Sequence, residues 1–256
     1  MELWTGPHAA TLLPALAVMI AIASVLRLLM KRKSWEARMI PIKVIAILLI
    51  LLEIGKQGIS LSRGYDLYHL PFHFCSLFLF MVPVMAFYRG KQQRQVCAIT
   101  SAICASLFLL MLIYPNLIYS ADNIREYFRD YMSFHTVTFH NLVMLAFLLI
   151  PALELHSPQP KADRKAAALF TVGFCVVSAS MAQLLKTNYA NFYSCNIPVL
   201  EAVRVSLQET LGYGLTQLLY VLIVSVLNVL FVLMSYQFCK LLLRLAQSKR
   251  HPVQTK

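Results

Sequence analysis

Long apolar runs separated by short polar stretches are the dominant pattern of the chain. A helix needs roughly 20 mostly apolar residues to cross the hydrocarbon core of a bilayer. Lipid leaves backbone groups no partner outside their own segment, so such runs form helices. The runs lie near residues 11–30, 40–60, 70–88, 96–114, 137–155, 166–185 and 215–239. The pattern therefore predicts an all-α polytopic membrane protein, with residues 1–256 forming a single bundle of seven transmembrane helices.

Composition supports this class. Hydrophobic residues make up 59% of the 256 positions, charged residues only 13%, and the mean hydropathy is +0.66. An average soluble domain has about 25% charged residues. Seven helices with short loops use the whole length, which excludes a sizeable soluble domain, and we expect no bound cofactor. The residues before the first run contain no Lys or Arg, unlike a cleaved signal peptide, so we expect that run to be retained.

The basic residues behind the formal net charge of +12 are distributed unevenly between the two sides of the expected topology. On one side of seven alternating spans lie 17 of the 23 basic residues: Arg27, Lys31, Arg32, Lys33, Arg38, Lys43, Arg89, Lys91, Arg94, Lys161, Arg164, Lys165, Lys240, Arg244, Lys249, Arg250 and Lys256. The positive-inside rule then places the N-terminus outside and the C-terminus in the cytoplasm. Membrane lipids are the expected partners and no nucleic acid is expected, because topology and anionic lipid explain the basicity. A multi-pass protein of the cell (inner) membrane is predicted.

Polar groups from four predicted spans share one depth, in the outer half of the bilayer. They are Glu53, Lys56 and Gln57 from the second span, His69, His73 and Cys75 from the third, His135, His140 and Asn141 from the fifth, and Gln183, Lys186, Asn188 and Tyr189 from the sixth. Ionisable groups at such depth are costly unless they pair or line a wet cavity, and they commonly mark a functional site. Structural alternatives exist: Glu53 and Lys56 can neutralise each other, and an intramembrane His can simply bond a neighbouring helix.

Spacing limits which groups can act together. Pro71 fits the first turn of the third helix, so His73 and Cys75 would lie about 200° apart around it. A base for Cys75 would then come from another helix, with His135 and His140 as the candidates. A thiol within reach of an imidazole yields a thiolate suited to covalent acyl transfer.

Further roles follow from the same spacing. His135 and His140 are five residues apart, about 140° around a helix, so we expect only one of them to face the thiol. The other imidazole, or His73, would polarise a carbonyl or orient a phosphate. Glu53, Lys56 and Asn188 would hold the polar head of a substrate. No closed metal-ligand spacing is present, so no metal site is expected.

Three short motifs resemble those of the YwaF-like bacterial integral membrane proteins. Leu70-Pro71-Phe72-His73-Phe74-Cys75 looks like the Leu-Pro-x-His-x-Cys signature of that family. Phe134-His135 with His140-Asn141-Leu142 resembles its second motif, and Asn188-Tyr189 resembles its Asn-Tyr motif. The aromatic, Gly-Pro-rich segment expected before the last span is replaced by Leu211-Gly212-Tyr213-Gly214.

The resemblance implies an activity and the residues that carry it. Remote eukaryotic relatives of the YwaF-like family include a transmembrane acyltransferase that remodels ether phospholipids through a catalytic Cys. It therefore implies acyl transfer with Cys75 as nucleophile and His135 or His140 as base. Asn188 and Tyr189 would belong to the substrate site, next to Glu53 and Lys56.

Other functions use the same polar groups. A transporter or permease component would bind a solute in this cavity, although no repeats or paired broken spans are visible. A retinal protein needs a Lys in the last span, and residues 215–238 contain none. A structural membrane protein is a further alternative, as is a Cys75–Cys195 disulfide that would remove the nucleophile.

Overall fold

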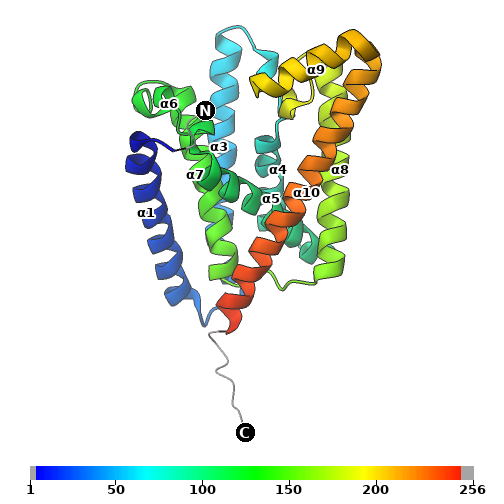
Figure 1. Ribbon diagram of the computed structural model, residues 1–256. Coiled ribbons are helices and arrows are strands. Elements are labelled where there is room, and N and C mark those ends of the chain that lie inside the picture. The colour runs from blue at the N-terminus through cyan, green and yellow to red at the C-terminus, as the bar shows by residue number, and fades with distance from the viewer. Residues whose placement is uncertain (1–3, 249–256) are drawn as a thin grey trace.

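The computed structural model describes residues 4–248, which form helices joined by turns and loops without any strand. The helices are α1 (Gly6–Met30), α2 (Trp35–Arg38), α3 (Ile40–Ser62), α4 (Leu77–Phe87), α5 (Gln93–Ile113), α6 (Ala121–Arg125), α7 (Tyr131–Ala152), α8 (Pro160–Leu185), α9 (Pro198–Leu211) and α10 (Tyr213–Ser248). Short 3₁₀ turns occur at η1 (Leu67–His69), η2 (Phe74–Ser76), η3 (Pro115–Leu117) and η4 (Tyr189–Asn191). The prediction of an all-α fold is confirmed for the described residues (Figure 1).

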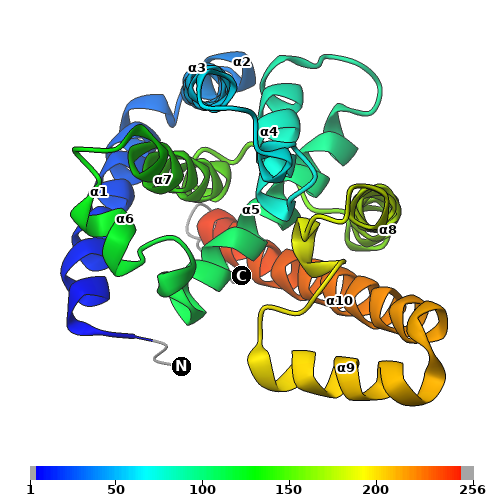
Figure 2. The same cartoon turned by 90° about the horizontal axis from the view of Figure 1, so that it is seen from above.

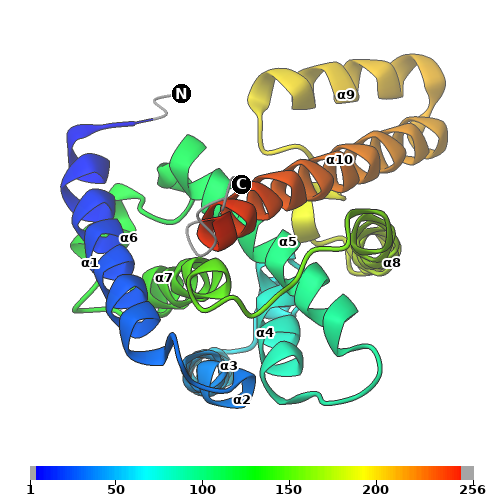
Figure 3. The ribbon, with the colours of Figure 1, turned by 90° about the horizontal axis from the view of Figure 1, so that it is seen from below.

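Helix α5 lies at the centre of the bundle and packs against α4, α7, α8 and α10 (Figure 3). Small residues cover much of its surface, and Ala98, Ala102, Cys104 and Ala105 are fully buried. Such residues let helix backbones approach closely in a membrane. The hydroxyl of Ser106 donates to the carbonyl of Ala102 within the same helix, so a buried polar group is satisfied without a partner helix.

Five helices within residues 4–248 are long and apolar enough to cross a membrane: α1, α5, α7, α8 and α10. Helix α4 has only 11 residues, and α3 carries Lys43, Glu53 and Lys56. A protein with several membrane-spanning helices is supported. The count of seven spans and the outside location of the N-terminus stay predictions.

Several helices extend beyond the predicted runs. Helix α7 begins at Tyr131 rather than at residue 137, because the side chain of Asp130 accepts a hydrogen bond from the Ser133 amide at 2.9 Å and caps the first turn. His135 and His140 therefore both lie inside this helix. Helix α10 continues to Ser248, nine residues past the predicted end.

The segment 70–76 corrects the prediction that Pro71 opens a helix. Leu70, which precedes the proline, is extended, as residues before proline usually are. His73 is also extended (φ −78°, ψ 155°), and Cys75 lies in the single turn η2. The carbonyl of Phe72 accepts a hydrogen bond from Ser178 Oγ at 2.7 Å, which fixes this irregular segment on α8. The helical angle of 200° between His73 and Cys75 is therefore wrong.

Helix α9 was not predicted. Its apolar residues alternate with polar ones, so it lacks the continuous run that marks a span. Pro198 occupies its first turn, where a missing amide costs nothing. Gly212 ends it at φ +77°, a conformation that favours glycine, and α10 begins at the next residue.

A buried polar cluster around Asp163 joins α5, α8 and α10. Asp163 is fully buried and accepts hydrogen bonds from His156 Nε2 at 3.0 Å, the Gln159 amide at 2.7 Å and Tyr236 Oη at 2.8 Å. Arg94 completes the cluster through an ion pair with the same carboxylate. A buried carboxylate needs such partners to offset its lost hydration.

We predict that Asp163→Asn destabilises the bundle by about 3 kcal/mol, because it leaves Arg94 and the buried His156 without their anion. The unfolding temperature in detergent, followed by intrinsic fluorescence, should fall by roughly 6–12 °C. Tyr236→Phe is the matched control, since it removes one hydrogen bond worth about 1 kcal/mol. Equal unfolding temperatures for Asp163→Asn and the unchanged protein would contradict this reading.

Candidate functional site

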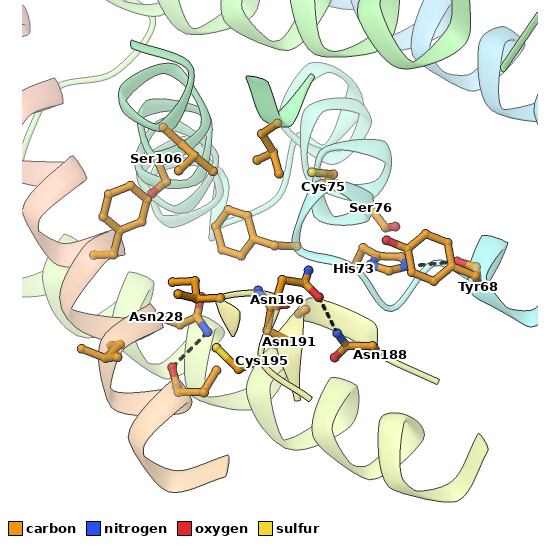
Figure 4. Close-up of a pocket in the computed structure, with 18 of the residues that line it drawn as sticks. Tyr68, His73, Cys75, Ser76, Ser106, Asn188, Asn191, Cys195, Asn196 and Asn228 are labelled. Atoms are coloured by element: carbon orange, nitrogen blue, oxygen red, sulfur yellow. Dashed lines mark hydrogen bonds between the residues drawn. The ribbon is translucent and has the colours of Figure 1, made fainter. Parts of the chain in front are cut away.

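A cavity of about 970 Å³ lies between α7 on one side and α9 and α10 on the other. Volumes of this size are typical of ligand sites. The residues that line it include seven predicted from sequence: Glu53, Lys56, His73, Cys75, His135, His140 and Asn188. Helices α3 and α7, the 70–76 loop and the loop after α8 thus place their polar side chains around one space. Figure 4 labels His73, Cys75 and Asn188 among them.

The charged groups of the cavity are paired. Lys56 Nζ lies 2.7 Å from Glu53 Oε1, so the structural alternative of mutual neutralisation is present. The other carboxylate oxygen, Glu53 Oε2, lies 3.3 Å from His135 Nε2, at ion-pair distance but without aligned hydrogen-bond geometry. Glu53 therefore connects α3 to α7 and restricts the position of the His135 imidazole.

His140 differs from His135 in the contacts of its ring nitrogens. Its Nδ1 lies 2.6 Å from the Thr136 carbonyl, which can only accept, so Nδ1 carries the proton. Nε2 then bears the lone pair. This atom is buried and has no hydrogen-bond partner among the described residues, and the side chain is only 8% exposed. Such a nitrogen can take a proton from a group that enters the cavity.

His73 is held by its own loop. Its Nε2 lies 2.9 Å from the Tyr68 carbonyl, and its ring packs 4.3 Å from the Tyr68 ring. Because the carbonyl accepts, Nε2 carries the proton and Nδ1 the lone pair. Gln57 fixes the start of this loop by donating to the His69 carbonyl at 3.0 Å. Figure 4 shows His73 and Tyr68 side by side at the edge of the cavity.

Cys75 is half-buried and lines the same cavity as both imidazoles of α7. Within the described part of the chain, no hydrogen bond joins its sulfur to an imidazole. The choice of His135 or His140 as the base for Cys75 therefore depends on the contacts of each imidazole ring. Cys195 also lines the cavity, from the opposite side in Figure 4. All six cysteines are free, so the alternative of a Cys75–Cys195 disulfide is not found in this structure.

Asn188 and Tyr189 have different surroundings. Asn188 lines the cavity, and its Nδ2 donates to Asn196 Oδ1 at 3.1 Å. Tyr189 is fully buried and is not among the cavity-lining residues, because its hydroxyl donates to the Leu67 carbonyl. Its ring lies 5.3 Å from that of His73. Tyr189 therefore supports the His73 loop from behind rather than facing a ligand.

An apolar part of the remaining wall was missed from sequence, and it is interrupted by polar residues such as Arg204, Thr216 and Asn228. It is formed by side chains of α5, α9 and α10: Leu107, Leu110, Leu200, Val203, Leu207, Leu211, Leu219, Ile223, Val224, Leu227 and Phe231. On α9, Val203, Leu207 and Leu211 recur every four residues, which is the helical period. This periodicity is the signal that could have identified α9 as an amphipathic helix.

The helices and this cavity define a multi-pass α-helical membrane protein with a polar site open to an apolar wall. The chain belongs to the TMEM164 family, whose model matches residues 3–236. This match covers nearly the whole chain, but it does not test the narrower resemblance to the YwaF-like proteins, which stays a prediction. Neither the curated proteins nor the solved structures contain a match to the chain.

Proposed function

We propose that this protein moves an acyl chain between a membrane phospholipid and an acceptor, through a thioester on Cys75. The observation that carries the proposal is a single cavity that combines a thiol, imidazoles and a long apolar wall. An amphiphile needs this combination, because its polar head and its acyl chain require different surroundings. The acceptor is a lysophospholipid hydroxyl for an acyltransferase or water for an acyl hydrolase.

The length of the apolar wall suits one acyl chain. Along α10 the lining extends from Thr216 to Phe231, fifteen residues further on, and is apolar except at Thr216, Tyr220 and Asn228. At 1.5 Å per residue this distance is about 22 Å. It exceeds the hydrocarbon depth of one leaflet, which is roughly 15 Å. A chain with its ester near Cys75 can therefore lie in the cavity along α10.

The first half of the reaction forms the thioester. The Cys75 thiol gives its proton to Nε2 of His140, and the sulfur attacks the carbonyl carbon of the lipid ester. The ester C–O bond breaks, and the leaving oxygen takes the proton from His140. A lysophospholipid departs and the acyl group stays on Cys75. Nε2 of both imidazoles lacks a hydrogen-bond partner among the described residues, but that of His135 lies 3.3 Å from the Glu53 carboxylate. We therefore assign the base to His140, whose Nδ1 is bound to the Thr136 carbonyl and whose Nε2 has no ion-pair contact.

The second half transfers the acyl group. The acceptor hydroxyl gives its proton to His140, and its oxygen attacks the thioester carbonyl. The C–S bond breaks, and the Cys75 sulfur regains the proton from His140. Glu53 positions His135 toward the developing oxyanion, while Lys56 and Asn188 contact the polar head of the lipid. The site would lie in the outer half of a cell membrane crossed seven times, with the N-terminus outside.

The experiment is a transfer assay with the purified full chain in phosphatidylcholine vesicles. The donor carries a radiolabelled acyl chain, and an unlabelled lysophospholipid is added as acceptor. We expect label in newly formed diacyl lipid, or in free fatty acid when the acceptor is omitted. Label that stays on the donor in both reactions would reject the proposal and favour solute transport through the same cavity.

A further inference from the structure

Helix α9 lies across the bundle rather than along it. Figure 2 shows α3 and α8 end-on, whereas α9 lies lengthwise in the plane of the view. Figure 1 shows α9 at the end of the bundle where α8 ends. Since α8 is among the helices suited to cross a membrane, a helix that runs crosswise at this end is expected to lie along the bilayer surface. An amphipathic helix in this position buries its apolar face among acyl chains.

The apolar face of α9 has little protein cover. Leu200, Val203, Leu207 and Leu211 are between 41% and 53% exposed, and all four line the cavity. No residue of α9 is buried. The face therefore forms a wall between the cavity and the outside, and each side chain needs an apolar partner that the described chain does not supply.

The polar side of α9 is fastened to its neighbours. Arg204 donates to Glu201 at 2.6 and 2.8 Å and to Gln217 of α10 at 3.0 Å, and its guanidinium lies 5.6 Å from the centre of the Tyr220 ring. Glu201 also accepts from the Cys195 amide at 2.8 Å. The hydrogen bond from Arg204 lowers the pKa of the Glu201 carboxyl, so the pair is charged at neutral pH. Arg204 also lines the cavity, so these contacts hold α9 along the edge where its apolar face meets α10.

We propose that α9 is a lateral gate whose apolar face receives the acyl chain of a bilayer phospholipid on its way into the cavity. The position of α9 favours an acyl chain as its ligand. Its apolar face lies crosswise to the spanning helices and continues into the apolar lining along α10. The polar edge keeps α9 attached while a chain passes its apolar face. The inference rests on the proposed function only in taking a phospholipid as the ligand.

The test uses a phosphatidylcholine with a photoreactive diazirine near the end of one acyl chain. The full chain carrying Cys75→Ala, which prevents turnover of the probe, is placed in vesicles of that lipid and phosphatidylcholine. After irradiation, mass spectrometry measures labelling of α5 at Leu110. This residue lines the cavity and is half-buried, so an acyl chain that has entered the cavity can reach it.

Val203→Asp should lower this labelling about tenfold, because it places a charge on the path of the acyl chain. Val205→Asp is the matched control: Val205 lies two residues away, is 44% exposed and does not line the cavity, so labelling should not change. Leu207→Gln provides a second variant on the gate face if Val203→Asp unfolds at a lower temperature than the parent.

The gate would be overturned if both variants were labelled as strongly as the parent. It would also be overturned if both lost labelling to the same extent while their unfolding temperatures stayed unchanged. The result is independent of acyl transfer, because the parent already lacks the thiol. If the labelling follows this pattern while the unsubstituted protein transfers no acyl chain, the gate stands and the enzymatic proposal fails.

Discussion

Cys75→Ala is expected to abolish acyl transfer, lowering its rate by about 10⁴-fold or more, the scale on which loss of a nucleophile reduces kcat. Without the sulfur no thioester forms at this position, and the first half of the proposed reaction cannot occur there. The measurement is the initial rate of label transfer in phosphatidylcholine vesicles.

Cys195→Ala is the matched control for this substitution. Cys195 is also a half-buried thiol that lines the cavity, so its loss changes the volume and polarity of the wall in a similar way. We expect its transfer rate to stay within about threefold of the unchanged protein, which is less than 1 kcal/mol. If the Cys195 variant lost transfer while the Cys75 variant kept it, Cys195 rather than Cys75 would be the nucleophile.

His140→Ala should lower the transfer rate by about 10²–10⁴-fold, the usual contribution of a general base. Its Nε2 is buried, carries a lone pair and has neither a hydrogen bond nor an ion-pair contact among the described residues, whereas Nε2 of His135 lies 3.3 Å from Glu53. Without it, neither the Cys75 thiol nor the acceptor hydroxyl has a group to take its proton. Initial rates and unfolding temperatures are measured on the same preparation, so that a folding defect is recognised.

His135→Ala separates the two imidazoles of α7. His135 contacts Glu53 at 3.3 Å and is proposed to face the developing oxyanion rather than to accept a proton, so we expect a loss of about 10²-fold. A larger loss for His135 than for His140, at equal unfolding temperature, would assign the base to His135 instead.

Local sequence signals were sufficient for the long helices and for several of the polar residues that line one cavity, whereas their depth in the membrane stays a prediction. Apolar runs and the ionisable residues that interrupt them can be read position by position. The sequence alone therefore predicted that Glu53, Cys75 and His140 lie near one another. Their chemical roles remain predictions.

Tertiary contacts decide what the sequence could not predict. The segment 70–76 is irregular because Ser178, more than one hundred residues away, binds the Phe72 carbonyl. Tyr189 turns away from the cavity because its hydroxyl reaches the Leu67 carbonyl. The cluster around Asp163 joins residues from three helices, and no spacing within one helix reveals it.

Helix α9 was missed for a different reason. Hydropathy identifies helices that are apolar on all sides, whereas α9 has one apolar face and one polar face. Its function in the proposed gate depends on lying next to α10 and above the cavity. That position becomes visible only in three dimensions.

The most direct test of the account is the detection of the acyl group on Cys75. The purified protein is mixed with a phospholipid whose acyl chain is isotopically labelled, quenched in acid and digested for mass spectrometry. We predict a labelled acyl mass on the peptide that contains Cys75, removed by neutral hydroxylamine and more abundant when no lysophospholipid is added, since only water can then take the acyl group. A peptide that stays unmodified while label is transferred at the full rate would contradict the thioester and with it the proposed role of the cavity.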